Sequence, residues 1–168
     1  MKKKIIFKGR LLNLFVERRK FPNNYVGTLE IVKHPGAVLI VPFLNNGKIA
    51  LIRQYRPVIK STIWELPAGT LHKNEAPLVC AKRELIEEIG YKAKEWKKLG
   101  HIYPAPGYTT EKILIYEARR LEKVGSDIQE DEVIVVKELT KNQIKRLLKS
   151  GKITDSKTIS ALTLTGIL

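Results

Sequence analysis

Three glutamates, Glu84, Glu87 and Glu88, lie close together in a segment that has the apolar periodicity of an amphipathic helix. Residues three or four apart share a helix face, and each like-charge pair at this spacing costs a few tenths of a kcal/mol. The carboxyl end of a helix disfavours anions by a further ~0.3–1 kcal/mol each. A bound cation would offset this repulsion, and carboxylate oxygens are the ligands that Mg²⁺ and Mn²⁺ prefer. The spacing therefore indicates a divalent-metal site.

The same carboxylates could instead form ion pairs with neighbouring cations. Lys82, Arg83 and Lys92 are close in sequence, and acidic helix faces are common. A zinc site is not expected, because Cys80 is the single cysteine and the three histidines are scattered along the chain. On the helix pattern alone, the metal and ion-pair interpretations both stand.

The residues around this helix fit a longer pattern. Five residues separate Gly69 from Glu75, seven separate Glu75 from Arg83, and the chain then reads RELIEEIGY as far as Tyr91. This segment resembles the Nudix box, G-x5-E-x7-R-E-U-x-E-E-x-G-U, where U is a bulky apolar residue, and every specified position is filled. The resemblance implies an α/β fold, the Nudix α/β/α sandwich around a mixed β-sheet. It also implies hydrolysis of a nucleoside diphosphate linked to another group.

The resemblance gives individual residues a role in metal binding. Glu84 and Glu88 would be the principal ligands of a divalent cation, which we expect to be Mg²⁺ with Mn²⁺ as a possible substitute. Ala68 would contribute its carbonyl oxygen. Glu87 would be a further ligand or would position the catalytic water. A metal of this kind lowers the pKa of bound water, so that hydroxide is available near neutral pH.

The other residues of the box are expected to support this site. Arg83 would hold the glutamates by ion pairs, and Glu75 would tie the preceding loop to the start of the helix. Gly69 and Gly90 would supply backbone conformations that a side chain would obstruct.

Segments outside the box resemble the ADP-ribose pyrophosphatase branch of the family. Residues 54–56 (QYR) and 64–69 (WELPAG) match its QYR…E-x-P-A-G pattern, and Pro106 lies sixteen residues after the last glycine of the box. An acidic loop precedes a strand at residues 130–135, and residues 151–155 (GKITD) match the carboxyl-terminal end. The implied reaction is the hydrolysis of ADP-ribose to AMP and ribose 5-phosphate.

The same resemblance suggests substrate contacts. Arg56 follows a buried strand beside the metal loop, where its guanidinium suits bidentate binding of phosphate oxygens. Glu65, Pro106 and Gly107 belong to the matched segments, although a plain turn is an alternative interpretation of the last two. Phe21 lies near the position of an adenine-stacking aromatic residue in the family.

A carboxylate of the acidic loop would complete the site by deprotonating or positioning the attacking water. The family pattern favours Glu130 as this catalytic residue. Glu132 is the alternative, because only one residue separates the two glutamates.

Hydropathy patterning predicts the elements that would hold these residues. Apolar runs at residues 37–43 and 48–55 predict two buried strands, joined by a hairpin-type turn at residues 45–47. The helix is expected from about residue 76 to residue 89, with Gly90 as its stop. The face that packs on the sheet is expected to carry Leu78, Ala81, Leu85 and Ile89. Further expected elements are strands near 26–33, 94–103, 112–118 and 133–137 and helices capped by Thr140 and Asp155.

We expect two regions with different roles. Residues 1–35 would form amino-terminal strands for dimerisation and substrate contact, and residues 36–168 would form the Nudix hydrolase domain as one unit. The family resemblance implies a homodimer that exchanges its amino-terminal strands, and the alternation of Leu12, Leu14 and Val16 agrees with a strand there.

Composition narrows the class of protein. The chain has 168 residues, of which 43% are apolar and 29% are charged, as in a single soluble globular domain. We expect no membrane span, because no apolar run approaches about 20 residues, and no secretory signal. One cysteine suggests a reducing, cytoplasmic setting. The net charge of +14 favours anionic partners, but without aromatic residues among the spread-out cations we expect no nucleic-acid partner.

Three alternative functions keep the same fold. The site could act on another nucleoside diphosphate sugar or on a dinucleoside polyphosphate. The chain could be a non-catalytic nucleotide sensor with the Nudix fold, against which the intact box argues. Processing of RNA ends is supported only by the net charge.

Overall fold

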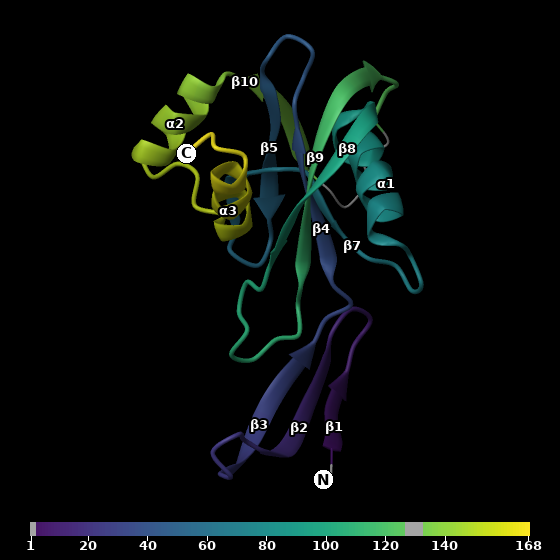
Figure 1. Cartoon of the computed structure of the whole chain (residues 1–168), viewed down its shortest axis with the longest axis vertical. Coiled ribbons are helices and arrows are strands. Elements are labelled where there is room, and N and C mark those ends of the chain that lie inside the picture. The colour runs from purple at the N-terminus through teal and green to yellow at the C-terminus, as the bar shows by residue number, and fades with distance from the viewer. Residues whose placement is uncertain (1–2, 127–132) are drawn as a thin grey trace.

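The amino-terminal strands form a sheet of their own. The computed structural model describes residues 3–126 and 133–168. β1 (Lys3–Lys8), β2 (Asn13–Lys20) and β3 (Val26–Lys33) are antiparallel neighbours in this order. The sheet projects from one end of the molecule, away from the helices (Figure 1). Backbone hydrogen bonds tie β3 to the loop before β9, from Val32 to Tyr108 and from Thr110 to Val32.

Two further sheets form the body of the molecule. The first has the order β7 (Ala68–Thr70), β4 (Ala37–Pro42), β9 (Ile113–Lys123) and β8 (Tyr91–Ile102). In it β4 and β9 are parallel, and the other pairs are antiparallel. The second is antiparallel, with the order β10 (Ile134–Leu139), β5 (Ile49–Arg56) and β6 (Ser61–Glu65).

The predicted turn at residues 45–47 is present, but it joins strands of two different sheets, β4 and β5. The two strands are joined by the expected turn, but a single bridge between Phe43 and Ile49 is all that pairs them among the described residues. The reason is that both edges of β4 are occupied, by β7 and β9, while β5 lies between β10 and β6. The strands therefore belong to two sheets, and every residue of β4 is buried between layers of apolar side chains.

Helices cover both sides of this body, which confirms the α/β/α arrangement (Figure 1). α1 (Pro77–Ile89) packs against one side, where Leu85 and Ile89 join an apolar cluster with residues of β4, β5 and β9. α2 (Lys141–Lys149) and α3 (Ser156–Leu164) cover the other side, where Ile144 and Leu162 join a second cluster. No helix in the described part of the chain is long and apolar enough to span a membrane.

Local sequence signals set the ends of α1. Pro77 occupies the first turn, where its missing N–H costs no hydrogen bond. Gly90 ends the helix in the left-handed conformation, with φ of 76°, and its N–H donates to the carbonyl of Ile86 at 2.9 Å. One predicted core residue is wrong, because Leu78 is 37% exposed and Cys80 takes the buried position of the first turns against β7.

The carboxyl-terminal helices begin at the predicted caps. The Thr140 hydroxyl accepts from the N–H of Gln143, whose side chain accepts in turn from the N–H of Thr140. The Asp155 carboxylate accepts from the N–H of Thr158 at 3.0 Å. The hydroxyl of Thr158 then accepts from the N–H of Leu66 at 2.9 Å, which fixes α3 to the segment between β6 and β7.

Candidate active site

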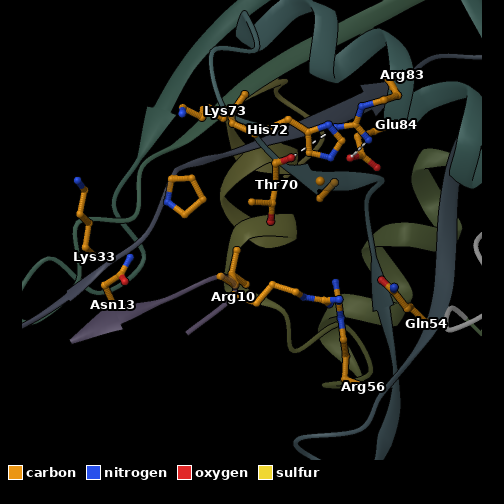
Figure 2. Close-up of a pocket in the computed structure, with 15 residues that line it drawn as sticks. Arg10, Asn13, Lys33, Gln54, Arg56, Thr70, His72, Lys73, Arg83 and Glu84 are labelled. Carbon is orange, nitrogen blue, oxygen red and sulfur yellow. Dashed lines mark hydrogen bonds and ion pairs between the residues drawn. The ribbon is translucent and has the colours of Figure 1, made fainter. Parts of the chain in front are cut away.

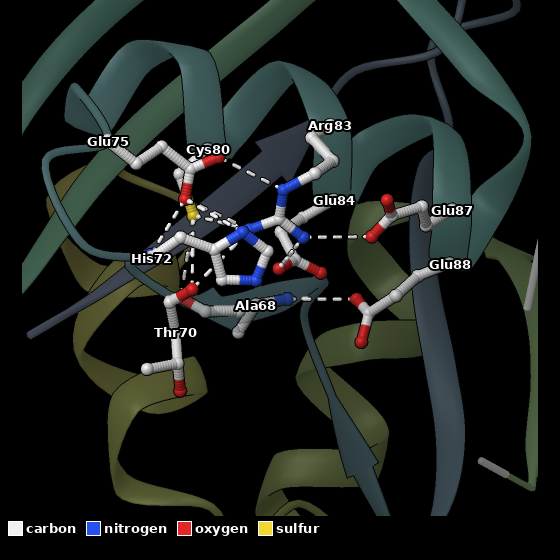
Figure 3. A network of polar contacts seen from close by, with 10 residues as sticks. Ala68, Thr70, His72, Glu75, Cys80, Arg83, Glu84, Glu87 and Glu88 are labelled. Atoms are coloured by element: carbon white, nitrogen blue, oxygen red, sulfur yellow. Dashed lines mark hydrogen bonds and ion pairs between the residues drawn. The ribbon is translucent and has the colours of Figure 1, made fainter. Parts of the chain in front are cut away.

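Two glutamates of α1 are buried against the backbone of β7. Glu84 is 8% exposed and Glu88 is 2% exposed. The Glu88 carboxylate accepts from the N–H of Ala68 at 2.9 Å (Figure 3). Glu84 lies against Gly69 so closely that a Cβ on Gly69 would be 1.8 Å from Glu84 Oε1. The box glycine is therefore required because the carboxylate occupies the space of a side chain.

Arg83 binds the acidic residues around it, as the sequence predicted. Its Nη1 donates to Glu84 at 2.6 Å and to Glu87 at 2.9 Å, while Nε and Nη2 donate to the two oxygens of Glu75 at 3.0 and 3.1 Å (Figure 3). The hydrogen bonds from Arg83 lower the pKa of Glu75 to about 2, and those to Glu75 raise the pKa of Arg83. The loop before α1 is thereby held to the helix.

The donors beside β7 suit a hard divalent cation. Among the described residues, no group of three or more His, Cys, Asp and Glu side chains is arranged to hold a metal ion. The two predicted principal ligands, Glu84 and Glu88, are buried carboxylates that lie against the backbone of Gly69 and Ala68. The third predicted carboxylate, Glu87, accepts from Arg83. Mg²⁺ usually takes one or two carboxylates and completes its shell with water and substrate phosphates. The residues present fit such an ion.

Arg56 is held in place by a buried carboxylate. Glu65 is fully buried, and it accepts from Arg56 Nε at 2.6 Å and from Arg56 Nη2 at 2.7 Å. Lys157 of α3 also contacts Glu65, and it donates to Asp155 at 2.9 Å. Burial raises the pKa of Glu65. The hydrogen bond from Arg56 and the charge of Lys157 together lower this pKa by more than burial raises it, so that the net shift is downward.

This geometry changes the role expected for Glu65. As a substrate contact it would need an exposed oxygen, but the side chain has no exposed surface and its oxygens accept from Arg56 and Lys157. Its position suits a residue that orients Arg56.

Two cavities meet at Arg56. The larger, of about 680 Å³, reaches from the turn between β1 and β2 to α1 (Figure 2). Its charged lining residues are Arg10, Lys33, Arg56, Lys73, Arg83 and Glu84. The smaller, of about 320 Å³, shares Arg56 and the residues of β7 and is also lined by Pro104, Glu111 and Lys157. The charged side chains of the larger cavity are mostly positive, and a cleft of this kind concentrates anions.

Three residues predicted to contact the substrate line neither of these two cavities. Phe21 packs against Tyr25 between β2 and β3, with ring centroids 5.8 Å apart. Pro106 and Gly107 lie in the turn before β9. In this turn the Ala105 carbonyl accepts from the N–H groups of Tyr108 and Thr109. That loop reaches the smaller cavity through other residues.

The two candidates for the catalytic carboxylate, Glu130 and Glu132, lie outside the described residues.

Sequence reasoning did not single out several cavity residues. Arg10 lies in a short turn and Lys33 at the end of β3, positions where a cation is ordinary. Lys157 follows a helix cap, and its partner Glu65 is 92 residues away in sequence. No local signal marks any of them, because the tertiary fold brings them to the site.

Cys80 is buried beneath the box loop. Its sulfur lies 3.6 Å from the Thr70 carbonyl and 3.3 Å from Arg83 Nη2. Burial raises the pKa of its thiol to about 12. The thiol is therefore protonated at neutral pH and is not a nucleophile.

Comparison with known proteins identifies the family of the chain. The NUDIX domain model matches residues 33–162. An ADP-ribose pyrophosphatase of Bacillus subtilis (strain 168) is 38% identical over 95% of this chain and 88% of its own. A methanol dehydrogenase activator of Bacillus methanolicus is 39% identical over 94% of this chain and 86% of its own. The solved structure of an ADP compounds hydrolase shares the fold, with a TM-score of 0.84, 24% identity and coverage of 98% of this chain and 90% of that one.

The chain therefore belongs to the NUDIX family and, with its complete box, is a Nudix hydrolase.

Proposed function

We propose that the protein hydrolyses the pyrophosphate bond of ADP-ribose and releases AMP and ribose 5-phosphate. The main support is the complete box, whose buried Glu84 lines a cavity with mostly positive charges and whose buried Glu88 contacts Ala68 of the same lining. The Bacillus subtilis relative, which matches nearly the whole chain, carries the corresponding name.

The proposed cofactor is Mg²⁺, with Mn²⁺ as a substitute. Glu84, Glu88 and the Ala68 carbonyl would hold it, and Glu87 would be a further ligand or would position the water. When bound, such an ion neutralises phosphate charge and lowers the pKa of a coordinated water. Arg83 and the N–H of Ala68 contribute by fixing the carboxylates in one arrangement, which removes a reorganisation cost from the reaction.

Arg56 is proposed to bind and orient the diphosphate. Two of its guanidinium nitrogens donate to Glu65, so the side chain is fixed in direction. The guanidinium lies where the two cavities meet, and it retains N–H groups that can donate to phosphate oxygens.

The substrate assignment is tested by a panel. Purified protein with Mg²⁺ or Mn²⁺ is given ADP-ribose, a second nucleoside diphosphate sugar or a diadenosine polyphosphate, and nucleoside monophosphate is measured chromatographically. We expect the highest kcat/KM for ADP-ribose and no turnover by Glu88→Gln. A higher value for another compound would move the assignment to that substrate, and binding of nucleotide without turnover would support a sensor.

We also propose Glu130 as the base that deprotonates or positions the attacking water. Glu130→Gln should lower kcat by about 10²-fold or more, the usual contribution of general-base catalysis, while Glu132→Gln should have less effect. The reverse ranking would assign the role to Glu132.

The Bacillus methanolicus relative supports a second candidate function, activation of a dehydrogenase. It is as similar to this chain as the pyrophosphatase is. Adding wild-type protein or Glu88→Gln to a methanol dehydrogenase assay tests it. Activation by the wild type alone would connect this function to hydrolysis, and no activation would remove the candidate.

We propose that residues 1–35 serve as a dimerisation region, with a second copy of the chain as the partner. Ile5, Phe7 and Tyr25 of this region are each more than half exposed, and exposed apolar groups of this size indicate an interaction surface. Sedimentation should give twice the monomer mass, and Phe7→Lys should shift the protein towards monomer. A monomeric wild type would contradict the proposal.

A further inference from the structure

Glu65 joins two cations that come from distant parts of the chain. Arg56 is the last residue of β5, and Lys157 lies in the first turn of α3. Both donate to the carboxylate of Glu65, which has no exposed surface. Lys157 therefore contacts the same carboxylate that, among the described residues, holds the Arg56 guanidinium by two hydrogen bonds.

The charges of this network are balanced. Glu65 and Asp155 supply two negative charges, and Arg56 and Lys157 supply two positive charges. A buried carboxylate is costly unless it is paired and hydrogen-bonded. Without Lys157, the network would carry a net negative charge beside the position proposed for the substrate phosphates.

We propose that Lys157 is a positioning residue for hydrolysis, which acts on the substrate through Glu65 and Arg56. By holding one side of the Glu65 carboxylate, it keeps Arg56 directed into the junction of the two cavities and cancels the excess negative charge there. The inference rests on the proposed function of Arg56 in binding a diphosphate.

Contacts other than those of the Lys157 ammonium also hold α3 in position. Asp155 caps the helix, and the Thr158 hydroxyl accepts from the N–H of Leu66 in the buried core. The apolar side chains of Ala161 and Leu162 complete the docking of the helix. The ammonium is therefore available for a role at the site, and the effects of its loss can be separated from unfolding.

The test measures two quantities for Lys157→Met, which keeps an apolar stem of similar length. We expect the KM for ADP-ribose and the dissociation constant of ADP each to rise about tenfold, the effect of losing one hydrogen bond to a charged group. We expect kcat to stay within about threefold and Lys157→Arg to restore most of the loss. Lys149→Met, on the exposed side of α2, is the matched control.

A double-mutant cycle with Glu65→Gln separates positioning from direct contact. If Lys157 acts through Glu65, adding Lys157→Met to Glu65→Gln should weaken ADP binding by less than about threefold. If the two substitutions each weakened ADP binding by the same factor in the double variant as alone, the proposal would be overturned. A Lys157→Met variant with an unchanged KM and a lowered melting temperature would also overturn it. Wild-type protein that binds ADP without hydrolysing ADP-ribose would contradict the proposed function alone, and the cycle in ADP binding would still decide the role of Lys157.

Discussion

Two carboxylates of the site lie in direct contact with the backbone of β7. Glu84 fills the space beside Gly69, and Glu88 accepts from the N–H of Ala68. Both carboxylates are buried, so their orientation is set by these contacts and by Arg83. A side chain at position 69 would therefore displace the Glu84 carboxylate before it affected the core.

Gly69→Ala should lower the activity of the protein without unfolding it. The new Cβ would be 1.8 Å from Glu84 Oε1, and the flexible carboxylate is the group that must move. We expect kcat/KM to fall by about 10–100-fold, as when the support of a metal ligand is lost, with a small change in melting temperature. In a Glu84→Gln background the same substitution should add little, and a full additional loss would place its effect elsewhere.

At the scale of elements, α1 and its preceding loop are joined by the ion pair between Arg83 and Glu75. This pair is local to the box, and with the hydrogen bond from the N–H of His72 to Glu75 it holds the loop against the helix. The pKa of Glu75 is about 2, below its ordinary 4.5, because Arg83 stabilises the ionised form.

The stability of this unit should therefore depend on pH. A lowered pKa in the folded state gives stability that is complete above pH 4.5 and is lost as the pH falls towards 2. Glu75→Gln should lower the melting temperature at pH 7, and its difference from the wild type should shrink between pH 4.5 and 2. Glu95→Gln, which removes an exposed pair with Arg120, is the control. A difference that stays constant with pH would contradict the linkage.

The helices were the elements most fully predictable from sequence. Gly90, Thr140 and Asp155 mark helix ends because caps depend on hydrogen bonds within a few residues. Helical spacing also placed Glu84 and Glu88 on one face of α1, whereas their burial results from the packing of α1 against β7.

Non-local pairing was not predictable. The separation of β4 and β5 depends on which strands occupy their edges. The link between Glu65 and Lys157 joins residues 92 apart, and neither has a neighbour in sequence that indicates the other.

At the scale of the whole molecule, the fold brings four segments to one cation-lined junction. The turn before β2, the end of β5, the box loop and the start of α3 all contribute lining residues. The net charge of +14 extends this positive field over the molecule. Binding of an anionic substrate should therefore stabilise the folded chain, and a divalent cation should stabilise it through the buried carboxylates of Glu84 and Glu88.

Mg²⁺ should raise the melting temperature of the wild type. A ligand at 100 times its dissociation constant stabilises the folded state by about 2.7 kcal/mol, which corresponds to roughly 5–10 °C for a domain of this size. The shift should disappear in Glu84→Gln and Glu88→Gln, whose folds should be intact by circular dichroism. Superimposable scans of the wild type with and without Mg²⁺ would contradict the metal site.

The single thiol, which lies beneath the box loop, can serve as a probe of local opening of the folded protein. Because Cys80 is covered and protonated, an alkylating reagent can react with it only while α1 is lifted from β7. The labelling rate of the native protein therefore measures the frequency of these openings. A ligand that binds both α1 and β7 should lower this rate. The reaction rate of this one thiol would thus report how often α1 separates from β7.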